Sequence, residues 1–257
     1  MSPETACAYF LYPRRNGNSA QTVTALPGAT PLAFRYQGNV LRGYTAGSGT
    51  KTVLLVHGWE SLAAHLHGFA QALLQAGFRV AAFDAPAHGD SEGAQGHVVE
   101  MGKAVLASRE AIGTIDAVIA HSAGSPASLY AMTHGLNAGA SVHIAGPASF
   151  ERVLQRFAQA CGLDEAGFIR FRGLVHEAIG IDPQQLEEDA IVRGLAHPAL
   201  LIHDKADKEV PCEESRRLQA RWPSAELMQV TGLGHRRIVQ DPAVIGKAVA
   251  FLQQKLP

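Results

Sequence analysis

The stretch Ile115-Asp-Ala-Val-Ile-Ala-His-Ser-Ala-Gly124 decides the fold of this chain. Its first part is an apolar run typical of a buried strand, and a helical pattern starts directly after it. Ser122 lies between the two, with the small residues Ala120 and Gly124 two positions away on either side, as a sharp strand–turn–helix elbow requires. Free N–H groups and the positive end of the helix favour anionic chemistry at such a hydroxyl. A serine here can also be an ordinary helix N-cap, so the rest of the chain has to decide.

Short apolar runs recur along the chain, and helical patterns lie between several of them. This alternation predicts an α/β fold, with a mostly parallel sheet that has helices on both faces. A strand pair around Gly38-Asn39 predicts a hairpin on an antiparallel edge. The predicted strands are Thr52–His57, Phe78–Phe83, Ile115–His121, Ser141–Ala145, Ala199–His203 and Ala225–Val230, with Pro31–Tyr36 and Val40–Ala46 in the hairpin. The predicted helices are Leu62–Gln75, Gln95–Ile112, Ala123–His134 and a last one that Asp241 and Pro242 open.

Residues 146–198 interrupt the alternation with 53 residues that contain no convincing strand. Apolar residues at helical spacing predict two amphipathic helices there, and Asp182-Pro183 predicts the start of a third. Glycines break the segment too often for one long crossover helix, so we interpret it as an inserted cap over the carboxyl edge of the sheet. The predicted core is therefore residues 1–145 and 199–257, and the small helical cap is residues 146–198.

The composition argues against several functional classes. With 22 Lys and Arg against 23 Asp and Glu, the formal net charge is −1, which gives no electrostatic signature of a nucleic-acid or anionic-membrane binder. The length of 257 residues, 47% of them hydrophobic, suits one α/β domain with a large core. Three cysteines, Cys7, Cys161 and Cys212, have neither disulfide nor metal-ligand spacing. No secretory signal or membrane-length apolar run is visible, so we expect a cytoplasmic enzyme without membrane or nucleic-acid partners.

Two loops that follow predicted strands carry residues that suit chemistry at Ser122, because function in open α/β sheets gathers at the carboxyl ends of the strands. One loop contains Asp204 and Asp207, and the other is Gly232-Leu233-Gly234-His235. The order along the chain is therefore serine, aspartate, histidine. A nucleophile, an acid and a base occur in this order in one of the known triad arrangements.

A third segment, His57-Gly58-Trp59, ends the Thr52–His57 strand in a turn where the glycine lets the backbone approach a ligand closely. The N–H of Trp59 can there pair with that of Ala123 to form an oxyanion hole. We interpret His57 and His88 as structural residues of such turns. His65 and His67 are two positions apart on a helical pattern, so they lie on different faces and do not suit a shared metal.

From about Thr52 to its C-terminus, the chain resembles the α/β-hydrolase superfamily, in particular its serine esterases and lipases. The pentad departs from the usual Gly-x-Ser-x-Gly in its first residue, Ala120. The resemblance implies an α/β-hydrolase fold with an inserted cap, no cofactor, and a triad of Ser122 as nucleophile, Asp207 as acid and His235 as base. The motifs that carry it are His57-Gly58-Trp59, Phe83-Asp84-Ala85-Pro86-Ala87-His88-Gly89-Asp90-Ser91, Ala120-His121-Ser122-Ala123-Gly124, Asp207-x-x-Val210-Pro211 and Gly234-His235.

Asp204 and Asp207 follow the same predicted strand, and one of them has to be the acid. Val210-Pro211 after Asp207 matches the motif of the family, and a carboxylate that reaches across to the neighbouring loop needs the extra length. We therefore choose Asp207 and expect the change Asp204→Asn to cost far less activity than the loss of Asp207.

The expected function is hydrolysis of a carboxylic ester or thioester of a small to medium substrate through a covalent acyl-enzyme. Carbon–carbon bond hydrolysis, acyl transfer and perhydrolysis can use the same triad, so they stay open as alternatives. A non-catalytic binding module on a hydrolase scaffold is a further alternative, although such a protein is expected to lack a triad member.

Overall fold

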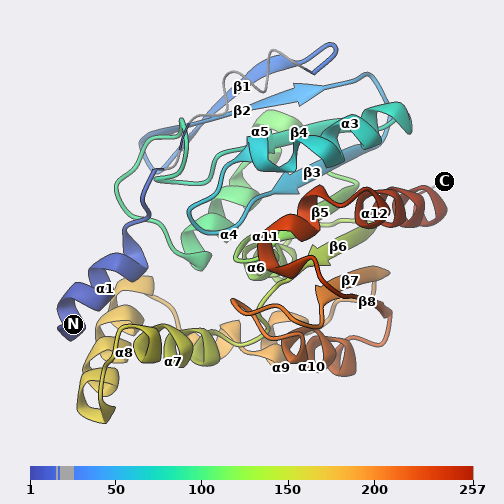
Figure 1. Cartoon of the computed structure of the whole chain (residues 1–257). Coiled ribbons are helices and arrows are strands. Elements are labelled where there is room, and N and C mark those ends of the chain that lie inside the picture. Colours follow the sequence, from blue (N-terminus) through green and yellow to red (C-terminus); the bar gives the residue numbers. More distant parts are fainter. Residues whose placement is uncertain (16, 18–25, 257) are drawn as a thin grey trace.

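Within the described residues, 1–15, 17 and 26–256, eight strands form one sheet with helices on both faces (Figure 1). The strands are β1 (Thr30–Tyr36), β2 (Asn39–Ala46), β3 (Thr52–Val56), β4 (Arg79–Phe83), β5 (Ala117–His121), β6 (Ala140–Ile144), β7 (Ala199–Asp204) and β8 (Ala225–Val230). The α-helices are α1 (Pro3–Leu11), α3 (His67–Gln75), α4 (Val98–Ala107), α5 (Arg109–Ile112), α6 (Gly124–Thr133), α7 (Phe150–Ala160), α8 (Glu165–Ile179), α9 (Glu188–Ile191), α10 (Glu213–Arg221), α11 (Gly234–Arg237) and α12 (Pro242–Lys255). Short 3-10 helices are η1 (Ala63–Leu66), η2 (Pro183–Leu186) and η3 (Ile238–Gln240).

The sheet of this computed structural model has the strand order β1-β2-β4-β3-β5-β6-β7-β8. Strands β3 to β8 run parallel to one another, whereas β2 pairs antiparallel with both β1 and β4. The predicted fold class is therefore confirmed, as is the hairpin on an antiparallel edge. Parallel order brings the carboxyl ends of β3, β5, β7 and β8 to one edge of the sheet, where the loops after these strands meet.

The central strands are buried on both faces, because successive side chains of a strand point to opposite sides. In β3, Val53 and Leu55 belong to one apolar core, whereas Leu54 and Val56 belong to the other. Helices α3 and α12 cover the first core, and α4, α6 and α10 cover the second. This two-sided burial is why the strands read as near-continuous apolar runs in the sequence.

Two local predictions need correction. The hairpin turn consists of Gln37 and Gly38, with φ values of +48° and +82°, and Asn39 is already the first residue of β2. Positive φ at both turn positions matches the twist of the two strands, which fixes the turn one residue earlier than predicted. The third helix predicted at Asp182-Pro183 is a single 3-10 turn, η2, because Glu187 adopts an extended conformation and ends it before α9.

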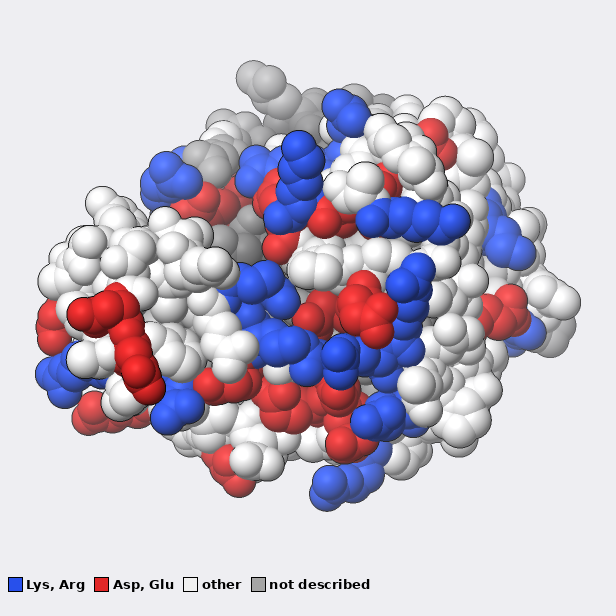
Figure 2. All heavy atoms as spheres, turned by 60° about the horizontal axis from the view of Figure 1, so that its bottom comes forward, with Lys and Arg blue, Asp and Glu red and all other residues white. Residues whose placement is uncertain are grey.

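The segment between β6 and β7 contains α7, α8, η2 and α9. Helices α7 and α8 lie in a lobe on one side of the molecule, whereas α9 packs against α6 and α10 beside the sheet (Figures 1 and 2). Helix α1 also packs on α8, although the sequence analysis assigned residues 1–145 to the core. Phe10 of α1 meets the rings of Phe157, Phe171 and Phe150 edge-on, with centroids 5.1, 5.8 and 6.0 Å apart. The N-terminal helix therefore shares the apolar core of the cap.

No helix in the described part of the chain combines the length and the apolar character needed to cross a membrane.

Burial lowers the pKa of eight histidines of the described chain from the ordinary value of 6.5, and five of these are almost completely buried. The pKa falls to about 4 for His57 and His97, and to about 3 for His88, His121 and His143. All five rings are at most 8% exposed, so protonation would place a cation in an apolar interior.

We expect the thermal stability of the protein to fall as the pH is lowered from about 6.5 toward 4. In that window the unfolded chain binds protons on these histidines while the folded protein does not, so acid favours unfolding. The contribution is fully present above pH 6.5 and is lost as the pH approaches the folded-state values. Melting temperatures from circular dichroism at pH 8, 6.5 and 5 test this, and a constant melting temperature between pH 8 and 5 contradicts it.

Candidate active site

Ser122 occupies the sharp turn between β5 and α6, and its φ of +53° lies in the left-handed region that non-glycine residues rarely adopt. The backbone around it is tightly packed. A Cβ on Gly124 would lie 2.5 Å from the carbonyl oxygen of His57, and a Cβ on Gly58 would lie 2.8 Å from the Cβ of Ser122. Ala120, the departure from the usual pentad, is a fully buried residue of β5, where a methyl group fits.

His235 is the residue that contacts the Ser122 hydroxyl. It lies on α11, and its Nε2 is 2.9 Å from Ser122 Oγ. Burial lowers the pKa of His121 to about 3. His121 Nε2 donates a hydrogen bond to the carbonyl oxygen of His235 over 2.9 Å. The short loop after β8 is therefore tied to the strand that ends at the serine.

Asp207 completes a line of three side chains, with Oδ2 2.8 Å from His235 Nδ1. Its other oxygen, Oδ1, accepts the N–H groups of Glu209 at 2.8 Å and Val210 at 2.9 Å. Burial alone would raise the pKa of the Asp207 carboxyl, but hydrogen bonds from His203, His235 and Val210 lower it well below its ordinary value. A charged Asp207 accepts the Nδ1–H of His235, which leaves Nε2 free to accept the proton of the Ser122 hydroxyl.

Asp204, the other candidate acid, binds backbone N–H groups of two loops instead. Its Oδ2 accepts the N–H groups of Leu233 at 2.6 Å and Gly234 at 3.0 Å, and its Oδ1 accepts the N–H of Ala206 at 2.7 Å. The carboxylate thus joins the loop that carries Asp207 to the loop that carries His235. Sequence reasoning did not foresee this role, because nothing in the sequence shows that the two loops meet at Asp204.

Sequence reasoning also missed His203, whose side chain is completely buried at the end of β7. Its Nδ1 accepts from Ser215 Oγ at 2.7 Å, and its Nε2 donates to the carbonyl oxygen of Val210 at 2.8 Å. The same Nε2 lies 3.4 Å from Asp207 Oδ2. A histidine that ends an otherwise apolar strand, four residues before a candidate acid, was the available signal.

The two N–H groups predicted to form an oxyanion hole, those of Trp59 and Ala123, flank Ser122. Ala123 is the next residue and caps α6, and Trp59 follows Gly58, whose backbone lies against the Ser122 side chain. Within the described residues, neither N–H donates a hydrogen bond. Both are therefore open to an acceptor beside the serine.

A cavity of about 470 Å³ lies between the sheet and the cap, and Ser122 and Ala123 line it. Most of the remaining wall is apolar and comes from α1, α4, α6, α7, η2 and the loops after β3, β6 and β7. This wall includes Phe10, Trp59, Val98, Pro126, Pro147, Phe150, Val153, Phe157, Ala160, Leu186 and Val210. The cavity gives an apolar substrate a place to lie against the serine.

A second serine–histidine contact joins Ser125 Oγ to His143 Nδ1 at 3.0 Å. Both residues are at most 1% exposed, and the other ring nitrogen of His143 lies 3.0 Å from Ser141 Oγ rather than near a carboxylate. Neither residue lines the cavity. The Ser125–His143 hydrogen bond is therefore buried in the interior and is not accessible to a substrate in the cavity.

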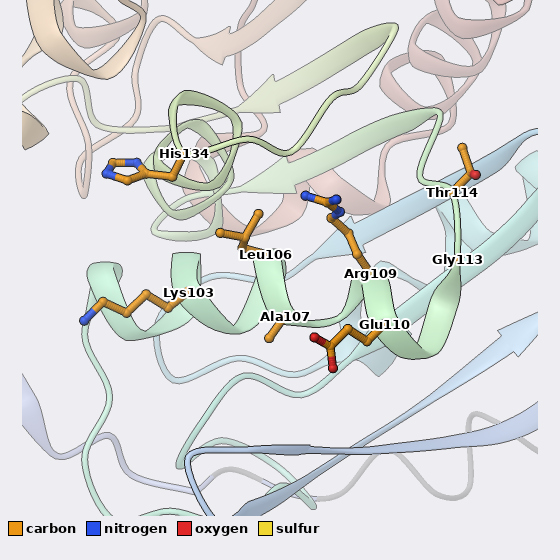
Figure 3. A pocket seen from close by; sticks show the side chains of 8 residues that line it. All are labelled: Lys103, Leu106, Ala107, Arg109, Glu110, Gly113, Thr114 and His134. Atoms are coloured by element: carbon orange, nitrogen blue, oxygen red, sulfur yellow. The ribbon is translucent and has the colours of Figure 1, made fainter.

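Another hollow, of about 600 Å³, lies along α4 and α5 and the end of α6 (Figure 3). It is larger than the cavity at Ser122, but its lining contains none of the three aligned side chains. Lys103, Arg109 and Glu110 project along its rim without converging on one point (Figure 3). Size alone therefore does not identify the functional site.

The other motifs quoted in the sequence analysis shape the loops around the site. His57 Nδ1 donates to the carbonyl oxygen of Gly58 at 2.7 Å, and its Nε2 accepts the N–H of Ala85 at 2.9 Å. The Asp84 carboxylate accepts the N–H groups of Ala63 and Asp90 at 2.8 and 2.9 Å.

Among the residues that the structure describes, no group of three or more His, Cys, Asp or Glu side chains is placed to hold a metal ion.

The mostly parallel sheet with helices on both faces and the serine at its strand–turn–helix elbow define an α/β hydrolase. A model of the serine aminopeptidase S33 family matches residues 47–180, which is just over half of the chain. The chain belongs to this family of α/β hydrolases.

Individual proteins that are similar to this chain share little of its sequence or match only a short part of it. The bifunctional biotin-biosynthesis protein BioHC of Teredinibacter turnerae is 34% identical over 74 residues, which are 28% of this chain and only 13% of that protein. An esterase of Pyrococcus furiosus shares the fold, with a TM-score of 0.72 and 20% identity over 95% of this chain and 100% of that chain. Est1E of Butyrivibrio proteoclasticus, solved with ferulic acid, has a TM-score of 0.70 and 16% identity over 88% of this chain and 99% of that chain. A thioesterase domain from the curacin biosynthetic pathway has a TM-score of 0.66 and 14% identity, over 88% of this chain and 99% of that chain.

Proposed function

We propose that this protein is a serine hydrolase that cleaves a carboxylic ester or thioester of a small to medium substrate through an acyl-enzyme. The observation that carries the proposal is the line from Ser122 Oγ through His235 to Asp207 at the wall of an apolar cavity. The esterase and thioesterase folds among the similar structures are consistent with this chemistry.

The reaction begins when His235 Nε2 accepts the Ser122 proton and Ser122 Oγ attacks the substrate carbonyl carbon. The N–H groups of Trp59 and Ala123 stabilise the oxyanion that forms. His235 then delivers the proton to the leaving alcohol or thiol, which departs and leaves the acyl group on Ser122. Water, deprotonated by His235, attacks the acyl-enzyme and releases the acid, while Asp207 stabilises the cationic histidine at each stage.

The charges around the cavity favour an ester over the free amino end of a peptide. Such a peptide carries an ammonium group that a carboxylate has to bind. Among the described residues that line the cavity, Glu209 is the one carboxylate, and Arg236 binds both of its oxygens at 3.1 and 3.4 Å. Arginine and lysine also line the cavity, at Arg156 and Lys208, and both repel an ammonium group.

A fluorophosphonate probe followed by peptide mass spectrometry tests the proposal, because such a probe phosphonylates an activated serine. We expect one label per chain, on Ser122. The same protein should hydrolyse p-nitrophenyl esters of short to medium acids. Labelling of another residue, or none together with no ester turnover, contradicts the proposal.

Phe10 is expected to limit the length of the acyl chain. Its ring lines the cavity and packs edge-on against Phe157, so Phe10→Ala lengthens the apolar space. The ratio of kcat/KM for decanoate over butyrate esters should rise about tenfold, the scale of hydrophobic discrimination in such pockets. Tyr9→Ala is the matched control, because Tyr9 is on the same helix but 54% exposed. An unchanged length profile in Phe10→Ala contradicts the assignment.

A further inference from the structure

One side of helix α7 faces the cavity. Val153, Arg156, Phe157 and Ala160 are spaced i, i+3, i+4 and i+7 along this helix, and all four line the cavity. Arg156 is the one charged residue in this otherwise apolar row, and its side chain is only 29% exposed. A guanidinium in such a place is costly unless it meets an anion.

The protein itself satisfies Arg156 only in part. Its Nη1 lies 3.1 Å from Glu214 Oε1, but that oxygen also accepts from Arg152 Nε at 2.8 Å. The second oxygen of Glu214 accepts from Arg152 Nη2 at 3.1 Å and from the N–H of Ala148 at 2.9 Å. One carboxylate is thus shared by two guanidinium groups, so Arg156 keeps donors for a further anion beside the cavity.

Lys208, in the loop that follows Asp207, is a second cation that lines the same cavity. Its ammonium group is exposed and has no hydrogen-bond or ion-pair partner among the residues that the structure describes. Glu209 beside it is bound by Arg236, and the pKa of His97, also in the lining, is lowered to about 4 by burial, so this ring is neutral at pH 7.

The surroundings of the cavity are therefore cationic in a protein whose formal net charge is −1. Figure 2 shows Lys and Arg side chains gathered near the middle of this face, beside the cap lobe, with Asp and Glu between them. Of the described residues that line the cavity, Arg156 and Lys208 are cations and Glu209, which Arg236 binds, is the one carboxylate.

We propose that the substrate of this site carries a second, anionic oxyacid group, a carboxylate or phosphate, that Arg156 and Lys208 bind while its ester lies against Ser122. The inference rests on the proposed function for its catalytic part, but anion binding at the two cations does not require turnover. A substrate with an apolar chain between an ester and an acidic group matches a cavity whose apolar wall also carries these two cations.

The test compares two p-nitrophenyl esters of equal size, the monoester of adipic acid and the ester of its neutral half-amide. In the native protein, kcat/KM should be about tenfold higher for the anionic ester, the scale of one charge-assisted hydrogen bond. Arg156→Gln and Lys208→Gln should each reduce this ratio several-fold, and the double variant should bring it close to one. The change should appear in KM, because the anion is bound equally before and during the reaction.

Lys103→Gln, at the other hollow, is the matched control, because it removes one positive charge and should leave the ratio unchanged. Since Arg156 also contacts Glu214, Arg156→Lys keeps a charge there and should retain part of the ratio. Calorimetric titration of Ser122→Ala protein with adipate and with inorganic phosphate measures binding without turnover and tells which anion the site prefers.

Two outcomes are distinct. A ratio near one in the native protein, or one that survives in the double variant, overturns the anion site and leaves ester hydrolysis standing. Loss of turnover on both esters, together with the absence of a fluorophosphonate label on Ser122, overturns the proposed function. In that case adipate or phosphate binding that depends on Arg156 and Lys208 still supports the anion site, and no such binding overturns it as well.

Discussion

Replacing Ser122 with alanine is expected to lower ester turnover by about 10⁶-fold, the loss known for removal of a nucleophilic serine. The hydroxyl is the one polar group that lies both on the cavity wall and 2.9 Å from His235 Nε2. Its removal leaves His235 and Asp207 hydrogen-bonded to each other, so the fold should be unaffected and the melting temperature should stay the same.

Ser125→Ala is the matched control, since Ser125 is the other elbow serine that contacts a histidine. It is fully buried, and its loss leaves His143 Nδ1 without a partner, which costs about 1–3 kcal/mol of stability. We therefore expect Ser122→Ala to be stable and inactive, and Ser125→Ala to be less stable but active. Assays of p-nitrophenyl ester hydrolysis and thermal melting curves of both variants measure these two effects. Full activity in Ser122→Ala contradicts the proposed mechanism.

The sheet could be predicted from the sequence because its central strands are buried on both faces. The runs at β3 and β5 are apolar at all positions but one, Thr52 in β3 and His121 in β5, and their predicted bounds differ from the structure by at most two residues. The positions after these strands could be placed together because parallel strands end at one edge of the sheet. Ser122 and His235 follow from that rule and from the order of the motifs, and the resemblance of Asp207-x-x-Val210-Pro211 to the family motif favoured Asp207 over Asp204.

The N-terminal helix α1 could not be predicted to reach the cavity. Its partners, Phe150, Phe157 and Phe171, lie about 140 to 160 residues further along the chain, and no local pattern encodes a contact at that separation. The role of Asp204 could not be predicted for a similar reason. The sequence pointed to Asp207 as the acid, but only the meeting of two loops shows that Asp204 binds backbone N–H groups.

The different contacts of Asp204 and Asp207 give the last prediction. Asp207→Asn is expected to lower turnover by about 10⁴-fold, as in the best-studied triad. The asparagine oxygen can still accept the N–H groups of Glu209 and Val210, so its amide N–H₂ faces His235 Nδ1. The histidine then carries its proton on Nε2 and cannot accept that of Ser122. Stability changes little, because the backbone hydrogen bonds remain.

Asp204→Asn should show the opposite pattern. In the native protein, the two carboxylate oxygens of Asp204 accept hydrogen bonds from the backbone N–H groups of Ala206, Leu233 and Gly234. The amide of an asparagine has only one oxygen that can accept them. At least one buried N–H then faces another N–H, which costs about 1–3 kcal/mol and lowers the melting temperature by about 2–4 °C for each kcal/mol. Below that temperature most of the turnover should remain, because the Asp207–His235 contact is intact. If Asp204→Asn instead loses turnover at an unchanged melting temperature while Asp207→Asn stays active, the acid is Asp204, and the geometry of the two loops has been misread.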